Sequence, residues 1–491
     1  MDYGFLKSGT DIRGYASDLG GKEIQLDNKT VEDIIYAFVV WYINRFDKNP
    51  EELKMSLGHD SRITADRICT AVKSALINSG VTVFDCGLAS TPAMFMTTID
   101  LNADAAIEIT ASHHPFDRNG IKIFIPTGGL EGKDIAEILE LAGQGMAVEN
   151  VNPGKVVDQD YMTVYADRLK KLIIDGAKKG DKPLEGKKIV VDAGNGVGGF
   201  YAHNVLKPLG ADITGSRYLE PDGMFPNHIP NPEDKTAMKS ICEAVISNSA
   251  DLGIIFDTDV DRAGCVGADG AEINRNRLIA LAAYIAVGGE KNKTIVTDSV
   301  TSDGLKSYIE DTLGCKHYRY RRGYKNVIDK AIELCEQGID CPLAIETSGH
   351  AALKENYFLD DGAYLATKIV IEIAKGTDIT KLLAPLKMPE DDLEIRIGID
   401  ASDFRDYGNK VINELEKYVS NNPIYKIADD NREGIRVSCY DGWFLLRLSV
   451  HDPVMPLNFE CDNKQGINKM IADLKPFFAG FDELSLPDVL I

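Results

Sequence analysis

The stretch Leu252-Gly-Ile-Ile-Phe-Asp-Thr-Asp-Val-Asp-Arg262 joins an apolar run to three aspartates at every second position. The apolar part predicts a buried strand, and the strand delivers Asp257, Asp259 and Asp261 to one loop. Alternate side chains of an extended segment lie about 7 Å apart, so the segment has to curl for the carboxylates to converge. Converging carboxylates repel one another, and Mg²⁺ between them offsets that repulsion. We therefore predict a magnesium site, with Arg262 beside it to offset charge or bind a phosphate; solvated acids in a polar loop are the alternative.

The same pattern, an apolar run followed by a polar or glycine-rich loop and an amphipathic helix, recurs along the chain. Further strands are expected at Val81–Phe84, Ala105–Ile109, Lys188–Val191 and Thr294–Val296. One helix is expected at 30–46, with Thr30 as its N-cap. Runs alternating with helices predict α/β layers with mostly parallel strands, whose chemistry gathers in loops at the carboxyl ends of the strands.

The length of 491 residues suggests three or four domains at about 100–200 residues each. After the third α/β stretch the pattern changes to strands expected at 394–397, 434–439 and 443–450, with helices between them. We therefore expect three α/β domains and a smaller C-terminal α+β domain. The predicted ranges are 1–165, 166–273, 274–388 and 389–491.

The formal net charge of −22 argues against nucleic-acid and anionic-membrane partners, which need basic surfaces. The nine cysteines are scattered without a CxxC pair, which is typical of reduced thiols in a cytoplasmic protein. The N-terminus lacks the pattern of a signal peptide, and no apolar run reaches the length of a membrane helix. We expect a cytoplasmic protein without a nucleic-acid or membrane partner.

A second motif, Ala-Ala-Ile-Glu-Ile-Thr-Ala-Ser-His-His-Pro (105–115), runs from a buried strand into a polar loop. Ser112 at the strand end, flanked by His113 and His114, is a candidate nucleophile. Loop packing or hydrogen bonding is the alternative role of the histidines. A zinc site is not expected, because no third ligand follows at a usual spacing.

Two further segments could recognise a sugar phosphate. The run 316–325 carries five basic residues and no acid, which favours either phosphate recognition or a solvated basic face. The segment 344–353 places Glu346, Ser348 and His350 after an apolar run, and such side chains suit sugar hydroxyls. By contrast, GNGVGG (194–199) does not match a dinucleotide-binding fingerprint.

Taken in order, these segments resemble the α-D-phosphohexomutase superfamily over nearly the whole chain. TASHHP (110–115) resembles its phosphoserine loop, DTDVDR (257–262) its magnesium loop and ETSGH (346–350) its sugar-binding loop. TDIRG (10–14) and NGIK (119–122) match further segments. The resemblance implies three related α/β domains with mixed, mostly parallel sheets, the smaller C-terminal phosphate-binding domain, and a central active-site cleft.

The resemblance also assigns roles to single residues. Ser112 carries the phosphoryl group, and Mg²⁺ is bound by its phosphate together with Asp257, Asp259 and Asp261. Lys122 or His350 handles the proton. The implied substrate-binding side chains are Arg13, His113, Arg262, Arg322, Lys325, Glu346, Ser348, Arg447, Ser449 and His451.

The implied reaction is interconversion of the 1- and 6-phosphates of glucose, mannose or both through a hexose bisphosphate, by a monomer or small homo-oligomer. The segment 447–453 departs from the family pattern, since Val450 and His451 replace a small residue and a threonine. Tyr324 replaces a common histidine. Three alternatives are a hexose-bisphosphate synthase on the same fold, a haloacid-dehalogenase-type phosphatase with Asp257 as nucleophile, and a non-catalytic sugar-phosphate sensor.

Overall fold

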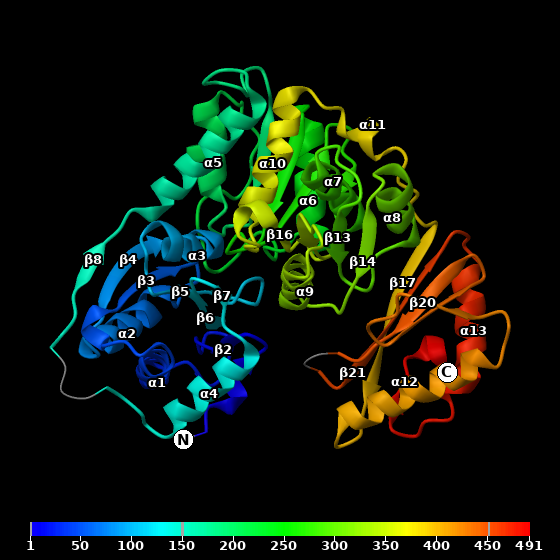
Figure 1. The fold of residues 1–491 in the computed structure, drawn as a ribbon, viewed down its shortest axis with the longest axis horizontal. Helices are drawn as coiled ribbons and strands as arrows, with labels where there is room; N and C mark the ends of the chain where they lie inside the picture. Colours follow the sequence, from blue (N-terminus) through cyan, green and yellow to red (C-terminus); the bar gives the residue numbers. More distant parts are fainter. Residues whose placement is uncertain (1, 149–151, 450–451) are drawn as a thin grey trace. The chain divides into compact units, whose positions relative to one another are not determined.

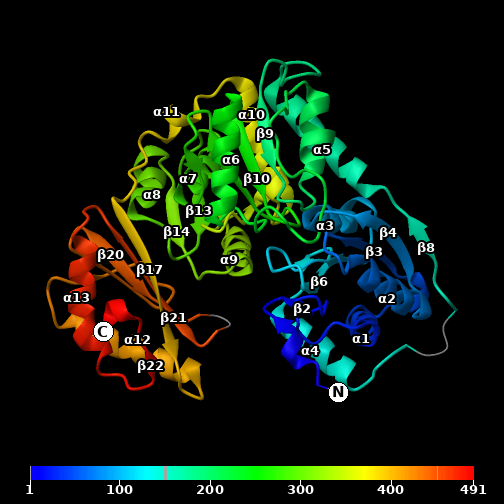
Figure 2. The same cartoon turned by 180° about the vertical axis from the view of Figure 1, so that it is seen from behind.

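The computed structural model describes residues 2–148, 152–449 and 452–491. The chain divides into two compact units. Figures 1 and 2 show the ribbon from opposite sides. Unit 1 comprises Met1–Asn274, Ser348–Ala351 and Leu359–Ile379. Unit 2 comprises Arg275–Thr347, Ala352–Phe358 and Thr380–Ile491.

The first sheet of unit 1 is mixed and has the strand order β1–β2–β6–β5–β3–β4–β8. Its strands are β1 (Lys7–Ser8), β2 (Asp11–Tyr15), β3 (Lys54–His59), β4 (Thr82–Leu88), β5 (Ala105–Ile109), β6 (Arg118–Ile125) and β8 (Val156–Asp158), and β7 (Gly128–Gly129) pairs with β6. The pairs β5–β3, β3–β4 and β4–β8 are parallel, whereas β1–β2, β2–β6 and β6–β5 are antiparallel. The loops after β3 and β5 therefore emerge at the same edge of the sheet.

Helices cover both faces of this sheet (Figure 1). The main apolar core joins the sheet to α1 (Asn28–Phe46), α2 (Ala65–Asn78) and α4 (Gly132–Gly143), while α3 (Thr91–Asp100) packs against β3 and β5. The predicted start of α1 was wrong by two residues. The N-cap is Asp27, whose carboxylate accepts the Thr30 N–H, so the Thr30 side chain is not the cap.

The second sheet lies in unit 1 with the order β12–β11–β10–β9. Its strands are β9 (Ile189–Asp192), β10 (Leu252–Phe256), β11 (Ala263–Gly267) and β12 (Glu272–Ile273). Only β9–β10 is a parallel pair in this sheet. The helix α6 (Lys235–Asn248) packs against β9 and β10, and α10 (Gly362–Lys375) packs against β10, β11 and α5 (Tyr161–Ala177) (Figure 2). Because α10 comes from much later in the chain, it brings the segment before it to the end of β10.

Unit 2 holds most of a third sheet, in the order β14–β13–β15–β16. Its strands are β13 (Thr294–Thr297), β14 (Lys316–Arg319), β15 (Leu343–Ile345) and β16 (Ala351–Leu353), and its helices are α7 (Asn276–Val287), α8 (Asp303–Ser307) and α9 (Tyr324–Glu336). The pairs β13–β14 and β13–β15 are parallel. An apolar cluster joins α9 to β13 and β15, so this sheet is also an α/β layer.

The C-terminal part of unit 2 is one sheet with two helices packed on it. The strand order is β18–β19–β20–β21–β17–β22, and the pairs are antiparallel. The strands are β17 (Asp391–Ile399), β18 (Lys426–Ile427), β19 (Ile435–Cys439), β20 (Gly442–Leu446), β21 (Val454–Cys461) and β22 (Leu484–Ser485), and the helices are α12 (Phe404–Ser420) and α13 (Gly466–Phe478). The strand predicted at 443–450 is shorter than expected, because β20 ends at Leu446.

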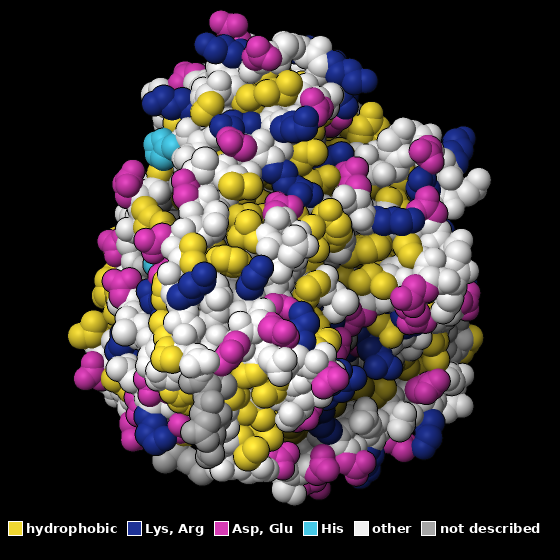
Figure 3. All heavy atoms as spheres, turned by 60° about the vertical axis from the view of Figure 1, so that its left-hand side comes forward, with side chains coloured by type: hydrophobic (Ala, Val, Ile, Leu, Met, Phe, Trp, Pro, Cys, Tyr) yellow, Lys and Arg dark blue, Asp and Glu magenta, His cyan; other side chains and the backbone are white. Residues whose placement is uncertain are grey.

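The architecture confirms the predicted class, three α/β layers and a C-terminal α+β domain with mixed sheets. The four domain ranges and the central cleft stay predictions. Among the described residues, none of the helices combines the length and apolarity required to cross a bilayer. On the face drawn in Figure 3, acidic and basic side chains are interspersed with apolar ones.

Candidate active site

The three aspartates of DTDVDR converge at the end of β10. Asp257, Asp259 and Asp261 are buried, and each offers an oxygen within 4.8 Å of the others. The chain curls between them because Val260 adopts a left-handed φ of +66°, which is rare for a β-branched residue. Its carbonyl accepts the Gly362 N–H at 3.1 Å, at the start of α10. The convergence predicted from the spacing is therefore present, and a contact from far along the chain supports it.

Basic and hydroxyl groups satisfy only part of this carboxylate cluster. Lys122 Nζ donates to Asp259 Oδ2 at 3.0 Å and to Asp261 Oδ2 at 2.5 Å. Arg262 Nε donates to Asp257 Oδ2 at 3.0 Å. The Oδ1 atoms of Asp259 and Asp261 are buried and have no hydrogen-bond partner in the described part of the chain. Unbonded carboxylate oxygens are the donor set that a hard divalent cation takes, so the cluster fits a metal ion.

The acidities of the cluster point to the same conclusion. Burial, followed by the charge of Asp261, raises the pKa of Asp257 well above its ordinary value. Burial would also raise the pKa of Asp261, but Lys122, His350 and Arg262 outweigh it and lower that pKa. Part of the rise at Asp257 comes from the neighbouring negative charge, and a cation among these oxygens would offset that repulsion.

Ser112 lies in the loop after β5, where a buried arginine holds the backbone. Arg62, 2% exposed, donates to the carbonyls of Pro115 at 2.7 Å, Arg118 at 2.9 Å and His114 at 2.6 Å, and also to that of Ser112. Its Nε bonds Asp60 at 3.2 Å. Ser112 itself adopts a left-handed φ of +51°. Four carbonyls bound to one guanidinium maintain this unusual conformation.

The Ser112 hydroxyl faces the carboxylate cluster. Its Oγ donates to Asp257 Oδ2 at 3.0 Å and accepts from Arg262 Nη2 at 3.0 Å. Arg262 Nη2 also donates to His113 Nδ1 at 2.6 Å. Because a guanidinium only donates, His113 Nδ1 has to be the acceptor and carries no proton. The candidate nucleophile and the candidate metal loop are therefore directly bonded.

The two loop histidines are neutral. Burial, and then the charge of Arg262, lowers the pKa of His113 to about 2. Burial, and then the charge of Arg13, lowers the pKa of His114 to about 3. The rings stack with centroids 5.2 Å apart. Neither ring is an imidazolium that could act as an acid at neutral pH, while each neutral ring keeps one N–H and one acceptor nitrogen. This favours the hydrogen-bonding role over an acid–base role.

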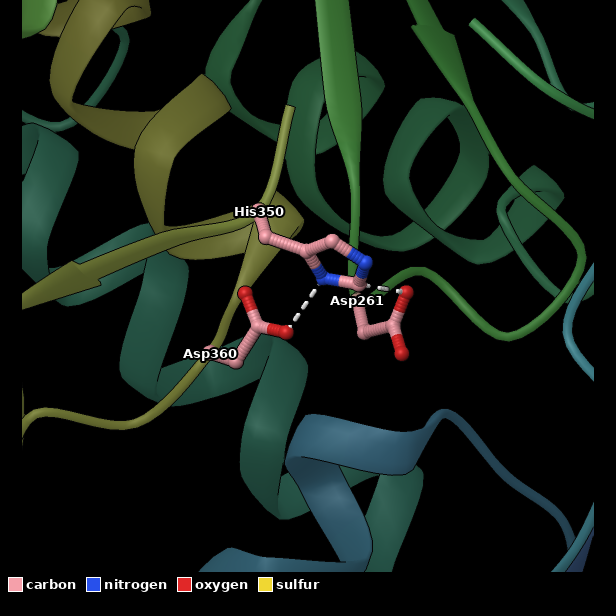
Figure 4. Close-up of side chains that lie close together, drawn as sticks. All are labelled: Asp261, His350 and Asp360. Atoms are coloured by element: carbon pink, nitrogen blue, oxygen red, sulfur yellow. Dashed lines mark hydrogen bonds and ion pairs between the residues drawn. The ribbon is translucent and has the colours of Figure 1, made fainter. Parts of the chain in front are cut away.

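His350 is protonated instead. Its Nδ1 bonds Asp360 Oδ2 at 2.5 Å and lies 3.9 Å from Asp261 Oδ1 (Figure 4). Burial would lower the pKa of His350, but Asp360 and Asp261 outweigh it and raise the pKa to about 9. An imidazolium cannot ligate a metal through Nδ1, so this trio is better described as an ion-pair network than as a second metal site.

Two other predicted residues of unit 1 lie around this centre. Arg13 on β2 donates to Asp11 Oδ2 at 2.7 Å, and its charge contributes to the low pKa values of His113 and His114. Ser348 is buried two residues before His350. Unit 1 thus contains Arg13, Ser112, His113, Lys122, Asp257, Asp259, Asp261, Arg262, Ser348 and His350.

The remaining predicted residues belong to unit 2. Glu346 accepts the Gly323 N–H at 2.6 Å, and Lys325 pairs with Asp329 at 3.0 Å on α9. Arg447 is buried, and Ser449 Oγ accepts the Asp452 N–H at 3.3 Å. His451 lies outside the described residues.

The basic run 316–325 divides into structural and surface residues. Arg319 is buried and bonds Thr301, Ser302, Asp303 and Asp430. Lys316 and Arg321 are exposed. Within this run, Arg322 and Lys325 are therefore the residues still predicted to bind phosphate.

Sequence reasoning missed Arg62, Asp60, Thr91 and Asp360. Arg62 and Asp60 follow β3 in GHDSR (58–62), a polar loop after a buried strand, which is the signal used for the other loops. Thr91 donates its hydroxyl to Asp259 Oδ2 at 2.6 Å. Nothing in the sequence marks Thr91 or Asp360, because their partners are distant in the chain.

Comparison with known proteins agrees with this geometry. Three models, described as phosphoglucomutase/phosphomannomutase alpha/beta/alpha domains I, II and III, match residues 10–146, 163–270 and 274–387. A phosphoglucomutase of Neisseria gonorrhoeae is 28% identical over 85% of this chain and 86% of its own length. A phosphomannomutase/phosphoglucomutase of Pseudomonas putida has the same identity and coverage.

A solved structure supports the same assignment. It is a phosphoglucomutase/phosphomannomutase family protein from Burkholderia thailandensis, with a TM-score of 0.82 and 25% identity, and the match covers 99% of this chain and 100% of that one. The motifs predicted this kinship, and the domain matches confirm it. The chain belongs to the phosphoglucomutase/phosphomannomutase family of the α-D-phosphohexomutase superfamily, a family of isomerase-type phosphotransferases.

Proposed function

We propose that this enzyme interconverts hexose 1-phosphates and hexose 6-phosphates of glucose, mannose or both, through phospho-Ser112 and a hexose bisphosphate. The observation that carries the proposal is the double contact of Ser112 Oγ, with Asp257 and with Arg262. This places a hydroxyl that can carry a phosphoryl group between a carboxylate of the metal-type cluster and a fixed cation.

Phosphoryl transfer depends mainly on positioning and electrostatics. Arg262 Nη2 donates to Ser112 Oγ and stabilises the charge that develops on this oxygen when its bond to phosphorus breaks. Asp257, Asp259 and Asp261 would hold Mg²⁺, which supplies neutralisation of the phosphoryl charge when bound.

The proton of the attacking sugar hydroxyl has to leave as the new ester forms. Lys122, which bonds Asp259 and Asp261, and His350 are the two candidates. A group accepts this proton only while it is itself neutral, and the pKa of His350, raised to about 9, keeps that side chain protonated. We therefore assign the exchange to the neutral amine form of Lys122. His350 is fixed by Asp360 and serves as a hydrogen-bond donor.

The substrate's other groups are assigned to further side chains. In this proposal Arg322, Lys325, Arg447, Ser449 and His451 bind the non-reacting phosphate. Glu346 and Ser348 bind sugar hydroxyls, and Arg13 and His113 complete the surroundings of the reacting phosphate. The cytoplasmic location, the bisphosphate activator and the monomer or small homo-oligomer remain part of the proposal.

The test is a substrate panel of hexose 1-phosphates with Mg²⁺ and a trace of hexose bisphosphate, followed by phosphorus NMR. We expect isomerised monophosphate, and intact-protein mass after incubation with bisphosphate should show one added phosphoryl group. The Ser112→Ala variant should remain folded but show neither isomerised monophosphate nor the added phosphoryl group. Full turnover in that variant would remove Ser112 as the carrier.

The same measurements separate the alternatives. Accumulated bisphosphate would indicate a synthase, and an acid-labile phosphoryl group on Asp257 with release of inorganic phosphate would indicate the phosphatase. Binding without turnover would indicate a sensor. None of the comparisons above favours these three.

A further inference from the structure

A carboxylate connects three loops of unit 2 at the predicted phosphate-binding residues. Glu433 lies just before β19, and its Oε2 accepts hydrogen bonds from Ser299 Oγ and, at 3.2 Å, from the backbone N–H of Arg322. Ser299 follows β13, and Arg322 precedes α9. One side chain of the C-terminal domain therefore binds donors from two loops of the third α/β domain.

Glu433 also acts on the second predicted phosphate ligand. Arg447 is only 7% exposed, and its Nε has no hydrogen-bond partner in the described part of the chain. Burial lowers the pKa of Arg447, and the charge that opposes this most strongly is Glu433. Within the residues described, Arg447 is therefore a buried cation with a free N–H donor and with Glu433 as its main opposite charge, and such a group can bind a phosphate oxygen.

A second, buried carboxyl group lies beside this arrangement. Asp298 is fully buried, its Oδ2 accepts from Thr347, and its Oδ1 has no hydrogen-bond partner among the described residues. Burial raises the pKa of Asp298, and the charge that opposes this most strongly is Arg322. Asp298 and Glu433 thus both act on the two arginines assigned to phosphate, Arg322 and Arg447.

A phosphate dianion that binds Arg322 and Arg447 meets repulsion from the Glu433 carboxylate. The donors that Glu433 occupies, a hydroxyl and a backbone N–H, are groups that phosphate oxygens also accept from. We propose that the Glu433 carboxylate competes with the phosphate of the substrate for the same donors. In this proposal Glu433 has to release Ser299 and the Arg322 N–H before the phosphate dianion binds. This inference rests on the assignment of Arg322 and Arg447 to phosphate in the proposed function.

The neighbours of Glu433 confine its movement. Asp430 bonds Arg319 at 3.2 Å, and Arg436 bonds Asp303 at 2.9 Å and stacks on Trp443. These contacts do not involve Glu433, so they hold both ends of the segment when its side chain is released. Arg432, next to Glu433, is also held, over the Tyr318 ring and at the Arg319 carbonyl. Displacement therefore requires a rotation of the Glu433 side chain itself.

The test compares Glu433→Gln with the unmodified enzyme by calorimetric titration with inorganic phosphate and with a hexose 6-phosphate. Glutamine keeps a carbonyl oxygen that can accept from both donors and removes the charge. We expect binding to become about tenfold tighter, which corresponds to about 1.4 kcal/mol. Equal or weaker binding in a variant that melts like the unmodified enzyme would overturn the proposal.

Two controls make the result specific. Glu416→Gln removes an exposed charge on α12 and should leave phosphate affinity unchanged, which excludes an effect of net charge alone. Glu433→Asp keeps the charge, and a gain equal to that of Glu433→Gln would refute competition by charge.

The titration also separates this proposal from the proposed function, because it measures binding without turnover. Arg447→Gln should weaken phosphate binding both in the unmodified enzyme and in the Glu433→Gln variant. If it does not, the assignment of Arg447 to phosphate is wrong and the competitor role falls with it. If binding behaves as expected in an enzyme without mutase activity, only the proposed reaction fails.

Discussion

Replacing Arg62 with methionine removes the guanidinium that holds the Ser112 loop while keeping an unbranched side chain. Arg62 is the donor to four loop carbonyls and the ion-pair partner of the fully buried Asp60. Removing one member of a buried ion pair typically costs about 3–5 kcal/mol, and a buried carbonyl left without a donor about 1–3 kcal/mol. The full sum would exceed the stability of most domains, so the loop has to rearrange.

The expected loss is therefore about 3–5 kcal/mol in the free energy of unfolding of unit 1. Burial already raises the pKa of Asp60, and loss of Arg62 removes the charge that opposes this rise most strongly. Movement of Ser112 Oγ by about 1 Å should reduce kcat by roughly 10²-fold. Urea unfolding and steady-state kinetics measure the two effects.

The matched control is the double variant Arg62→Met with Asp60→Asn, which removes the uncompensated acid. It should recover about 1–2 kcal/mol of stability but not kcat, because the four carbonyls remain without Arg62. The stability and kcat of Arg62→Lys should lie between those of the unmodified enzyme and those of Arg62→Met, since an ammonium cannot reach all four carbonyls. A single methionine variant with unchanged kcat and a stability loss below about 1 kcal/mol would refute the bracing role.

Three further variants test other parts of the structure. Asp259→Asn should lose the thermal stabilisation by Mg²⁺ and at least about 10²-fold in kcat, and retention of both would remove the metal assignment. Burial would lower the pKa of His228, but its bond to Asp192 at 3.0 Å outweighs burial and raises the pKa. The pair therefore stabilises the fold fully at pH values below the unfolded-state pKa of about 6.5. This stabilisation is lost as the pH rises through the folded-state pKa. Urea midpoints from pH 6 to 9 should therefore fall less steeply in His228→Gln, and parallel profiles would contradict this. Gly304→Ala would place Cβ 1.9 Å from the Lys387 carbonyl oxygen and should cost about 1–3 kcal/mol, whereas an unchanged melting temperature would show that the 387–390 segment moves aside.

The short-range signals predicted much of this protein. The apolar runs before DTDVDR and TASHHP are the buried strands β10 and β5, with the bounds expected from the sequence. An apolar segment that ends abruptly in polar residues has few ways to satisfy its backbone except as a strand leading into a loop. The order of these loops also identified the superfamily before any fold was known.

The tertiary structure decided what the loops are bonded to. Arg62 reaches the Ser112 loop because β3 lies beside β5 in the first sheet. Lys122 on β6 of that sheet reaches Asp259 and Asp261 in the loop after β10 of the second sheet. His113 and His350 look alike in the sequence, yet one is neutral beside Arg262 and the other cationic beside Asp360. The sequence by itself therefore determined which residue types stand at the strand ends, since strands and loops form from local pattern. Protonation and pairing depend on burial and on charges brought from distant segments, and these exist only in the folded chain.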